Sequence, residues 1–334
     1  MGITNSCFPV SSPDALPARC PVVALVNIMD NAEGTERHFR RMLESANPSA
    51  EIILCRMSCA SQDPKYFKEQ DYLLSNRYAN WHDVIGHHPI DLVIVTGINR
   101  GGLTYKELRE EYSHFWNETS ELLTTIKYAT QAGKIGHSLL VCWSAFAAMK
   151  LFSGVDKGIY DRKLLGLFEH HVAKANHHLL QQLNLPSLRV PHSRFSYMNE
   201  TQLREAIRAE GGDVLLEGPG GPALWTLHDD RMTCIINHPE YSEDTLEREY
   251  KRDCAVNPST ARPLHYDLNS PETLRDFEVL REFCQSFYRN LLIQAEDQRK
   301  AHQKISGKST SFSEKWLPLS GSNFLRNGEK PSKS

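Results

Sequence analysis

The sequence predicts an α/β protein built on a doubly wound, mostly parallel β-sheet with helices on both of its faces. Two observations support this prediction. Short apolar runs typical of buried strands alternate with helical stretches along the N-terminal half of the chain. Gly97, Cys142 and His238 each lie just past the end of such a run. Because ligands in this fold class bind beyond the carboxyl ends of the strands, we expect the functional site to lie there.

The N-terminal half of the chain contains most of the expected parallel strands. Residues 22–28 form a continuous β-rich run, as expected for a strand that is covered on both faces. A helix follows over 35–43, since Phe39, Met42 and Leu43 are spaced to share one helical face. The other elements expected here are strands at 51–57, 91–96 and 138–142, a mostly helical stretch at 105–132 and a helix from residue 143.

The C-terminal half carries shorter strand-like runs and then helices. The runs lie at 214–216, 223–227 and 232–236, with a Gly/Pro-rich turn at 218–222. Helical patterns follow at 243–253 and 274–296. For the chain as a whole, we expect a flexible extension at 1–20, one catalytic domain at 21–297 and a Lys/Ser/Gly-rich disordered tail at 298–334.

The composition argues against several classes of function. The formal net charge is -3, so no positive surface favours nucleic acid as a partner. No apolar stretch is long enough to span a bilayer, and the N-terminus lacks a basic segment followed by an apolar one, so we expect no membrane partner. The eight cysteines are scattered, which indicates reduced thiols in a cytoplasmic protein rather than a disulfide framework.

Cys142 joins a strand-like run to a helix-like run, which is the geometry of a nucleophile elbow. The sharp turn exposes the side chain, and the N-terminus of the helix favours a thiolate and a developing oxyanion. His238 and Glu240 follow a later apolar run and are suited to be the base and the carboxylate that orients it. A cysteine that closes a buried strand is more often a small core residue. The elbow pattern and the downstream His-x-Glu favour catalysis instead.

Several histidines and cysteines invite a metal-binding interpretation. They are the doublets His87-His88, His170-His171 and His177-His178, together with Cys55 and Cys59. None of these pairs has the spacing of a closed zinc site, and adjacent histidines in a strand or loop point apart. We therefore expect no metal site.

Five ordered blocks of the sequence carry a family resemblance. They are Cys142-Trp143, 163–171 (KLLGLFEHH), 191–194 (PHSR), 238–241 (HPEY) and 249–253 (EYKRD). Together they resemble the homoserine O-succinyltransferase/O-acetyltransferase family, which has a class I glutamine amidotransferase-like fold. The resemblance covers residues 20–295 and identifies 21–297 as an acyltransferase domain. It implies ping-pong transfer of an acyl group from acyl-CoA to the γ-hydroxyl of L-homoserine or a related hydroxy amino acid, with no bound cofactor.

The resemblance also implies a role for each residue of the site. Cys142 would carry the acyl group as a thioester, His238 would be the general base and Glu240 would orient that base. The backbone N–H of Trp143 would form the oxyanion hole with one from the turn after the third strand. The polar groups of the amino acid would be bound by Lys163, Ser193 and Arg252. A homodimer is the family expectation.

Gly101 bears on the identity of the acyl donor. At this position the family has glycine where the acyl group is succinyl and glutamate where it is acetyl, so the resemblance favours succinyl-CoA. Arg100 could pair with the succinyl carboxylate. The loops at 30–32 and 98–100 depart from the family pattern. Acetyl-CoA as donor, and serine or another analogue as acceptor, therefore stay open.

Three other functions also stay open. A glutaminase of this fold has glycines two residues before and after its cysteine and a glutamine four residues after it. This chain has Leu140, Ser144 and Phe146 there, which disfavours a glutaminase. The remaining alternatives are a hydrolase of the same superfamily and a non-catalytic binding paralogue. A paralogue that had lost its catalytic activity would have no reason to keep the cysteine, histidine, glutamate and arginine of the site together, which disfavours the last alternative.

Overall fold

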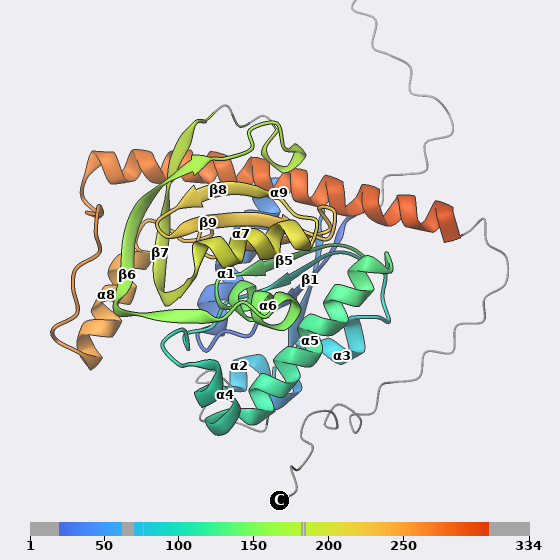
Figure 1. The fold of residues 1–334 in the computed structure, drawn as a ribbon, viewed down its shortest axis with the longest axis horizontal. Helices are drawn as coiled ribbons and strands as arrows, with labels where there is room; N and C mark the ends of the chain where they lie inside the picture. The colour runs from blue at the N-terminus through green and yellow to red at the C-terminus, as the bar shows by residue number, and fades with distance from the viewer. Residues whose placement is uncertain (1–19, 62–69, 76, 182, 184, 307–334) are drawn as a thin grey trace, which may run out of the picture.

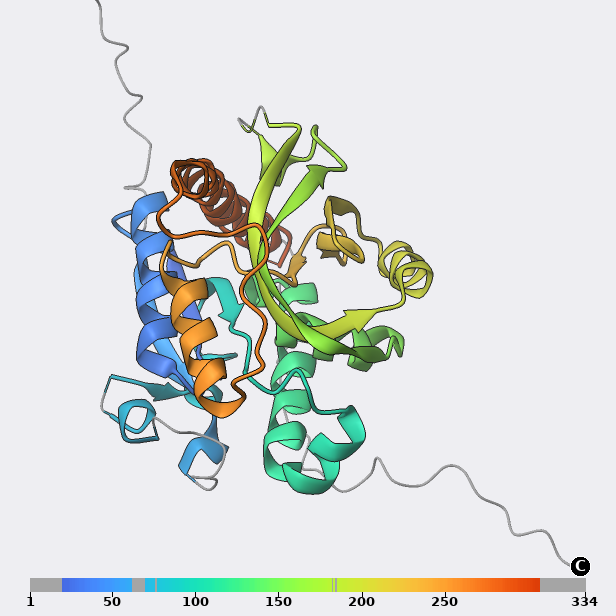
Figure 2. The same cartoon turned by 90° about the vertical axis from the view of Figure 1, so that its left-hand side faces the viewer.

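The protein, as a computed structural model, is described over residues 20–61, 70–75, 77–181, 183 and 185–306. Within these residues one mixed sheet is covered by helices on both faces, as Figures 1 and 2 show. The order of strands across the sheet is β3-β2-β1-β4-β5-β10-β9-β8-β6-β7. The order reverses between β1 and β4, so the loops after these two strands diverge and leave room for a ligand.

The half of the sheet that begins with β3 is parallel and confirms the predicted doubly wound arrangement. β1, β4 and β5 are buried along their whole length, which explains the apolar runs at 22–26, 92–95 and 139–141. The parallel strands are β1 (Val22–Val26), β2 (Glu51–Arg56), β3 (Ala79–Asn80), β4 (Ile90–Val95), β5 (Ile135–Val141) and β10 (Met232–Ile235).

The other half of the sheet is antiparallel. It consists of β9 (Gly221–Leu227), β8 (Val214–Gly218), β6 (Lys157–Val172) and β7 (Ser187–Met198). The sequence predicted β8 and β9 but not β6 and β7. β6 has exposed charged residues at its centre and no regular alternation of burial, so it lacks the pattern that marks a strand. Figure 1 shows these two long strands curving along one edge of the molecule.

Two layers of helices enclose the sheet. α1 (Ala32–Ala46) and α9 (Pro271–Ser306) pack together on one face. The predicted face of α1, formed by Phe39, Met42 and Leu43, is buried as expected. The opposite face carries α5 (Ser113–Gln131), α6 (Trp143–Ser153) and α7 (Glu200–Ala209). The remaining helices are α2 (Gln70–Leu73), α3 (Trp81–Val84), α4 (Tyr105–Glu111) and α8 (Thr245–Val256).

The C-terminal boundary differs from the prediction. α9 runs to Ser306, so the predicted tail cannot begin at residue 298. Arg299 is buried and its Nε donates to Oδ1 of Asp91 at the start of β4. Gly136 lets the helix come close, since a Cβ there would lie 2.0 Å from the carbonyl oxygen of Ala295. Residues 1–19 and 307–334 lie outside the described residues, so the predicted extension and the rest of the tail stay predictions. Among the described helices, none combines the length and apolarity that crossing a membrane requires.

Candidate active site

Cys142 lies at the sharp turn between β5 and α6. Its backbone has φ 54° and ψ -115°, a conformation that is strained for any residue except glycine. The hydroxyl of Ser144 braces the turn, because it accepts from the N–H of Val141 at 2.8 Å and lies 3.0 Å from the carbonyl oxygen of Val95. The N–H of Cys142 itself donates to Ile235 in β10 at 2.6 Å. The neighbouring strands therefore hold the elbow that the sequence predicted.

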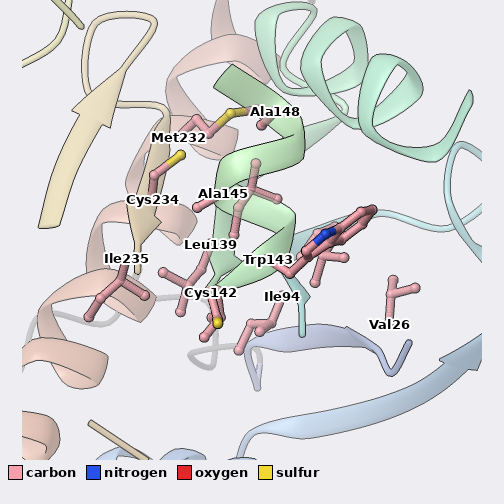
Figure 3. Packing of buried hydrophobic residues seen from close by; sticks show 14 of the residues in the cluster. Val26, Ile94, Leu139, Cys142, Trp143, Ala145, Ala148, Met232, Cys234 and Ile235 are labelled. Carbon is pink, nitrogen blue, oxygen red and sulfur yellow. The ribbon is translucent and has the colours of Figure 1, made fainter. Parts of the chain in front are cut away.

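The packing beneath the elbow brings the helix close to the sheet. Figure 3 shows Cys142 at the N-terminal end of α6, next to apolar side chains that include Leu139. Ala145 and Ala148 are fully buried in α6. Their small side chains allow the helix to approach the strands closely, so the helix N-terminus is directed at the sulfur and at any group bound to it.

His238 and Glu240 complete the predicted constellation. Nδ1 of His238 lies 2.8 Å from Oε1 of Glu240, and the Cys142 side chain is the second hydrogen-bond partner of the ring. The exposed fractions of Cys142, His238 and Glu240 are 8%, 4% and 4%. The imidazole therefore connects the sulfur to the carboxylate in a site that is largely shielded from water.

The environment of His238 favours its protonated form. Burial alone would lower its pKa, but the negative charges of Cys142 and Glu240 and their hydrogen bonds outweigh that effect, and the pKa lies well above its usual value. An imidazolium beside the sulfur stabilises a thiolate. The pair is therefore poised for nucleophilic attack.

Residues from other elements fix the position of the histidine. The N–H of His238 donates to the carbonyl of Pro191 in β7 at 3.0 Å. Arg41 of α1 donates to the backbone oxygen of Glu240, also at 3.0 Å. Tyr241 stacks on the imidazole with ring centres 4.4 Å apart and ring planes 16° apart. The sequence analysis did not single out Tyr241, although it directly follows Glu240.

A buried chain of neutral histidines lies behind the base. The Nε2 atoms of His170 and His192 are 2.9 Å apart, and the side-chain amide of Asn237 lies 3.1 Å from the same His170 nitrogen. Burial lowers the pKa of His170 to about 4, so its ring is uncharged at neutral pH. This network fixes Asn237, the residue directly before His238.

The three predicted acceptor-binding residues lie around two carboxylates of α8, Glu249 and Asp253. Asp253 lies 2.7 Å from the ammonium of Lys163 and 2.8 Å from the guanidinium of Arg252. Lys163 lies 3.5 Å from Glu249, Arg252 also lies 3.5 Å from it, and the hydroxyl of Ser193 donates to it. The Tyr241 hydroxyl donates to its other oxygen at 3.0 Å, which links the cluster to the ring that stacks on His238.

Glu249 is a functional candidate that sequence reasoning missed. Burial would raise its pKa, but Lys163, Arg252 and the Ser193 hydrogen bond outweigh burial, and the pKa of Glu249 lies below its usual range. A buried carboxylate that stays charged can bind an ammonium group. The sequence signals for it were its place in the block 249–253 and its position one helical turn before Arg252.

The turn after β4 packs against the elbow. A Cβ added to Gly97 would lie 2.9 Å from Cβ of Cys142 and 3.5 Å from the backbone nitrogen of Trp143. Trp143 is the first residue of α6, where an N–H has no acceptor within its own helix. The turn therefore packs directly against the elbow, beside the start of α6. An oxyanion hole formed by the N–H of Trp143 and one N–H of this turn stays a prediction.

Arg100 and Gly101 occupy different environments within this turn. The guanidinium of Arg100 lies 3.6 Å from the carboxylate of Asp30, in the loop that follows β1. The two loops that depart from the family pattern thus contact each other through an ion pair. The carbonyl of Gly101 accepts instead from the ammonium of Lys157 at 2.7 Å. Lys157 was not among the residues that the sequence analysis singled out.

One of the histidine doublets does lie beside a carboxylate. His177, His178 and Asp230 place possible ligand atoms within 4.8 Å of one another. However, Nδ1 of His177 accepts the N–H of Leu179 at 3.3 Å, so the ring proton is on Nε2, which lies 3.1 Å from Asp230. This contact joins His177 to the loop that follows β9.

Comparisons with solved structures define the class of fold. The chain is similar to a glutamine amidotransferase from Thermotoga maritima, with a TM-score of 0.52, 14% identity and coverage of 82% of this chain and 98% of that one. A glutamine amidotransferase from Methylobacillus flagellatus matches with a TM-score of 0.50, 14% identity and coverage of 82% and 94%. The protein therefore has the class I glutamine amidotransferase-like α/β fold.

Comparisons of sequence then identify the family. The family model described as homoserine O-succinyltransferase matches residues 12–320. The homoserine O-succinyltransferase of Alteromonas mediterranea is 31% identical over 247 residues, which cover 73% of this chain and 72% of that protein. The homoserine O-acetyltransferase of Bacillus pumilus is 27% identical over 252 residues, covering 75% and 78%. The chain belongs to the homoserine O-succinyltransferase family.

Proposed function

We propose that this protein transfers an acyl group from acyl-CoA to the hydroxyl of L-homoserine or a related hydroxy amino acid, through a thioester on Cys142. Family membership supports an O-acyltransferase that acts on homoserine. The single observation that carries the covalent mechanism is the buried arrangement of Cys142, His238 and Glu240 at the strained turn after β5.

In the first half-reaction the Cys142 thiolate attacks the thioester carbonyl of acyl-CoA. The negative charge that develops on the carbonyl oxygen is stabilised by backbone N–H groups of Trp143 and of the turn after β4. The bond between the carbonyl carbon and the CoA sulfur then breaks. His238, which is protonated beside the thiolate, gives its proton to the departing CoA sulfur. The products are the Cys142 acyl thioester, free CoA and a neutral imidazole.

In the second half-reaction the neutral imidazole acts as a base. His238 takes the proton of the acceptor hydroxyl as its oxygen attacks the thioester carbonyl. The bond to the Cys142 sulfur breaks, the ester product leaves, and the thiolate and imidazolium are restored. Glu240 holds the ring through Nδ1 and stabilises its charge in both directions.

The acceptor site follows from the cluster around Glu249. We assign Arg252 to the carboxylate of the amino acid, because a guanidinium can bind a carboxylate through two parallel hydrogen bonds. Lys163 and Ser193 bind further polar groups, and Glu249 is the carboxylate suited to the ammonium. Tyr241 connects this cluster to His238, which supports a position of the acceptor hydroxyl near the base.

For the donor we propose succinyl-CoA in preference to acetyl-CoA. The support is the family pattern, in which glycine at the position of Gly101 goes with a succinyl group. Arg100 pairs with Asp30, so binding of a succinyl carboxylate by Arg100 requires that the two anions share one guanidinium.

Mass spectrometry of the intact protein tests the mechanism. Incubation with succinyl-CoA or acetyl-CoA is expected to add one acyl group to Cys142, and L-homoserine is expected to remove it as the O-acyl ester. Two control incubations serve as comparisons. In one the protein is given glutamine, and in the other it is given acyl-CoA without an acceptor. Release of ammonia from glutamine would support a glutaminase, and rapid hydrolysis without an acceptor would support a hydrolase. A protein that no acyl-CoA labels would contradict the proposal.

A further inference from the structure

Lys157, the first residue of β6, reaches across to the loop that follows β4. Its ammonium donates to the carbonyl oxygens of Gly101 at 2.7 Å and Leu103 at 2.5 Å. It also lies 3.3 Å from the hydroxyl of Ser196, which donates to the Gly101 oxygen at 2.9 Å. One side chain therefore ties this loop to both long antiparallel strands.

The opposite end of the same loop touches the nucleophile. Gly97 packs so closely on Cys142 that a Cβ there would lie 2.9 Å from the cysteine Cβ. Between the two ends, the loop closes on itself through the N–H of Leu103, which donates to the carbonyl of Arg100 at 3.1 Å. A shift at the Lys157 end can therefore be transmitted over a short, closed stretch of backbone to the space beside the sulfur.

We propose that Lys157 is a positioning residue for acyl transfer, which holds loop 97–103 in the conformation that lines the acyl pocket and the oxyanion hole. The inference rests on the proposed function. An ammonium suits this task because its three N–H donors match the three oxygens around it. Without it, the carbonyl of Leu103 would lose its hydrogen bond to the ammonium and the carbonyl of Gly101 would keep only the Ser196 hydroxyl, so the loop would move to expose these oxygens to water.

The surroundings of Lys157 make its hydrogen bonds to loop 97–103 sensitive to pH. Burial lowers the pKa of Lys157 to about 8, against the opposing charges of Glu107 and Cys142. Tyr105 of α4 also faces the ammonium, whose nitrogen lies 5.5 Å from the ring centre. Above about pH 8 the ammonium of Lys157 loses a proton, so the side chain loses its charge and one of its three N–H donors to the loop. Acylation of Cys142 should therefore weaken through this pH range.

The test compares Lys157→Met with the matched control Lys127→Met. Lys127 is also half-buried, with its ammonium 3.2 Å from Glu210 and 4.6 Å from the ring centre of Phe152, but it does not contact the loop. Hydrogen exchange of peptides covering 97–103 is expected to be several-fold faster in Lys157→Met than in Lys127→Met. The acylation rate is expected to fall on the order of tenfold to a hundredfold in Lys157→Met alone.

Two further readouts separate positioning from a general loss of stability. The KM of the acceptor should stay within about twofold of wild type, because the Glu249 cluster does not contact the loop. The decline in acylation rate near pH 8 should disappear in Lys157→Met. Equal hydrogen exchange and equal acylation rates in the two variants would overturn the inference. If acyl-CoA does not label the wild-type protein, the proposed function fails, while the exchange comparison still decides whether Lys157 holds the loop.

Discussion

The backbone conformation of Cys142 is energetically unfavourable, and hydrogen bonds from neighbouring residues stabilise it. A non-glycine residue in such a conformation is destabilised by about 1–3 kcal/mol. The hydrogen bonds of Ser144 to β4 and β5 and of the Cys142 N–H to β10 offset this cost. Strain of this kind at the end of a buried strand is typical of a functional site.

Replacing Cys142 with serine tests the role of the sulfur. Serine fits the same space, so we expect Cys142→Ser to fold with a melting temperature close to that of wild type. Acyl transfer should fall by about a thousandfold or more, because a neutral hydroxyl is a far weaker nucleophile than a thiolate. Intact mass after incubation with acyl-CoA measures the effect. Substantial turnover, or an acyl group on a different cysteine, would show that the mechanism is wrong.

Arg252 is expected to determine affinity for the acceptor. Arg252→Lys keeps the charge but loses the two parallel hydrogen bonds to a carboxylate, so the KM of the acceptor should rise on the order of tenfold. Acylation by the donor alone should change little. Arg248→Lys is the matched control, since Arg248 lies on the same helix and pairs with Asp244 at 3.1 Å. Equal damage to both half-reactions would indicate that Arg252 has a structural role.

At the scale of single elements, we expect the loop after β4 to determine whether succinyl-CoA or acetyl-CoA is the acyl donor. A Cβ on Gly101 would lie 3.2 Å from the hydroxyl of Ser196, a contact that a small shift relieves. We expect Gly101→Glu to depress succinyl transfer through lost space and repulsion between carboxylates, and to spare acetyl transfer. Gly102→Glu is the control, because the nearest atom to a Cβ there is 3.9 Å away on Phe195. The ratio of the two acylation rates is the measurement, and an unchanged ratio in Gly101→Glu would refute the pocket assignment.

α9 is the element whose extent the sequence underestimated, and its last turns contribute to stability. A chain that ends at residue 297 loses Arg299, the buried cation beside Asp91. Removal of one member of a buried ion pair costs about 3–5 kcal/mol, so the melting temperature should fall by roughly 5–15 °C. A chain that ends at residue 306 keeps the pair and should melt like the full-length protein. Equal melting temperatures for the two truncated chains would mean that the pair contributes little.

For the molecule as a whole, partly buried carboxylates with lowered pKa values contribute to stability and make it depend on acid pH. Burial would raise the pKa of Asp230, but hydrogen bonds from His177 and Thr226 outweigh it and lower the pKa to about 2. The carboxylate therefore contributes stability that is fully present above its unfolded-state pKa of about 4 and is lost as the pH falls toward 2. The pKa of Glu249 is likewise lowered, by Lys163 and Arg252 against burial, so it acts in the same direction.

Denaturant unfolding between pH 7 and pH 2 checks this expectation. The unfolding free energy of the wild type should decline below about pH 4. Asp230→Asn should be less stable at pH 7 and should lose less stability on acidification, because its amide does not titrate. Parallel pH curves for the two proteins would contradict this assignment.

Whole-molecule folding also assembles the site from distant segments. Cys142 follows β5, His238 follows β10, and Pro191 and Ser193 belong to β7. These strands meet because β10 pairs in parallel with β5, so both end at the same edge of the sheet. The second half of the sheet then adds Lys157 and two of the predicted acceptor-binding residues, Lys163 and Ser193, and α8 adds Arg252.

The sequence by itself determined the features that repeat locally. Buried parallel strands are rich in apolar residues, so β1, β4 and the last part of β5 were predictable, and the joint at Cys142 and the His-x-Glu after β10 followed from them. The ordered blocks were sufficient to identify the family, which the family model confirms.

Only the tertiary structure decided the pairings between distant residues. The pairing of β6 with β7, the contact of Arg100 with Asp30, the hold of Lys157 on Gly101 and the anchoring of α9 by Asp91 are examples. Each depends on a hydrogen bond or an ion pair between residues far apart in the chain. Such contacts leave no periodic pattern in the sequence, because the partners are brought together by the burial of other residues.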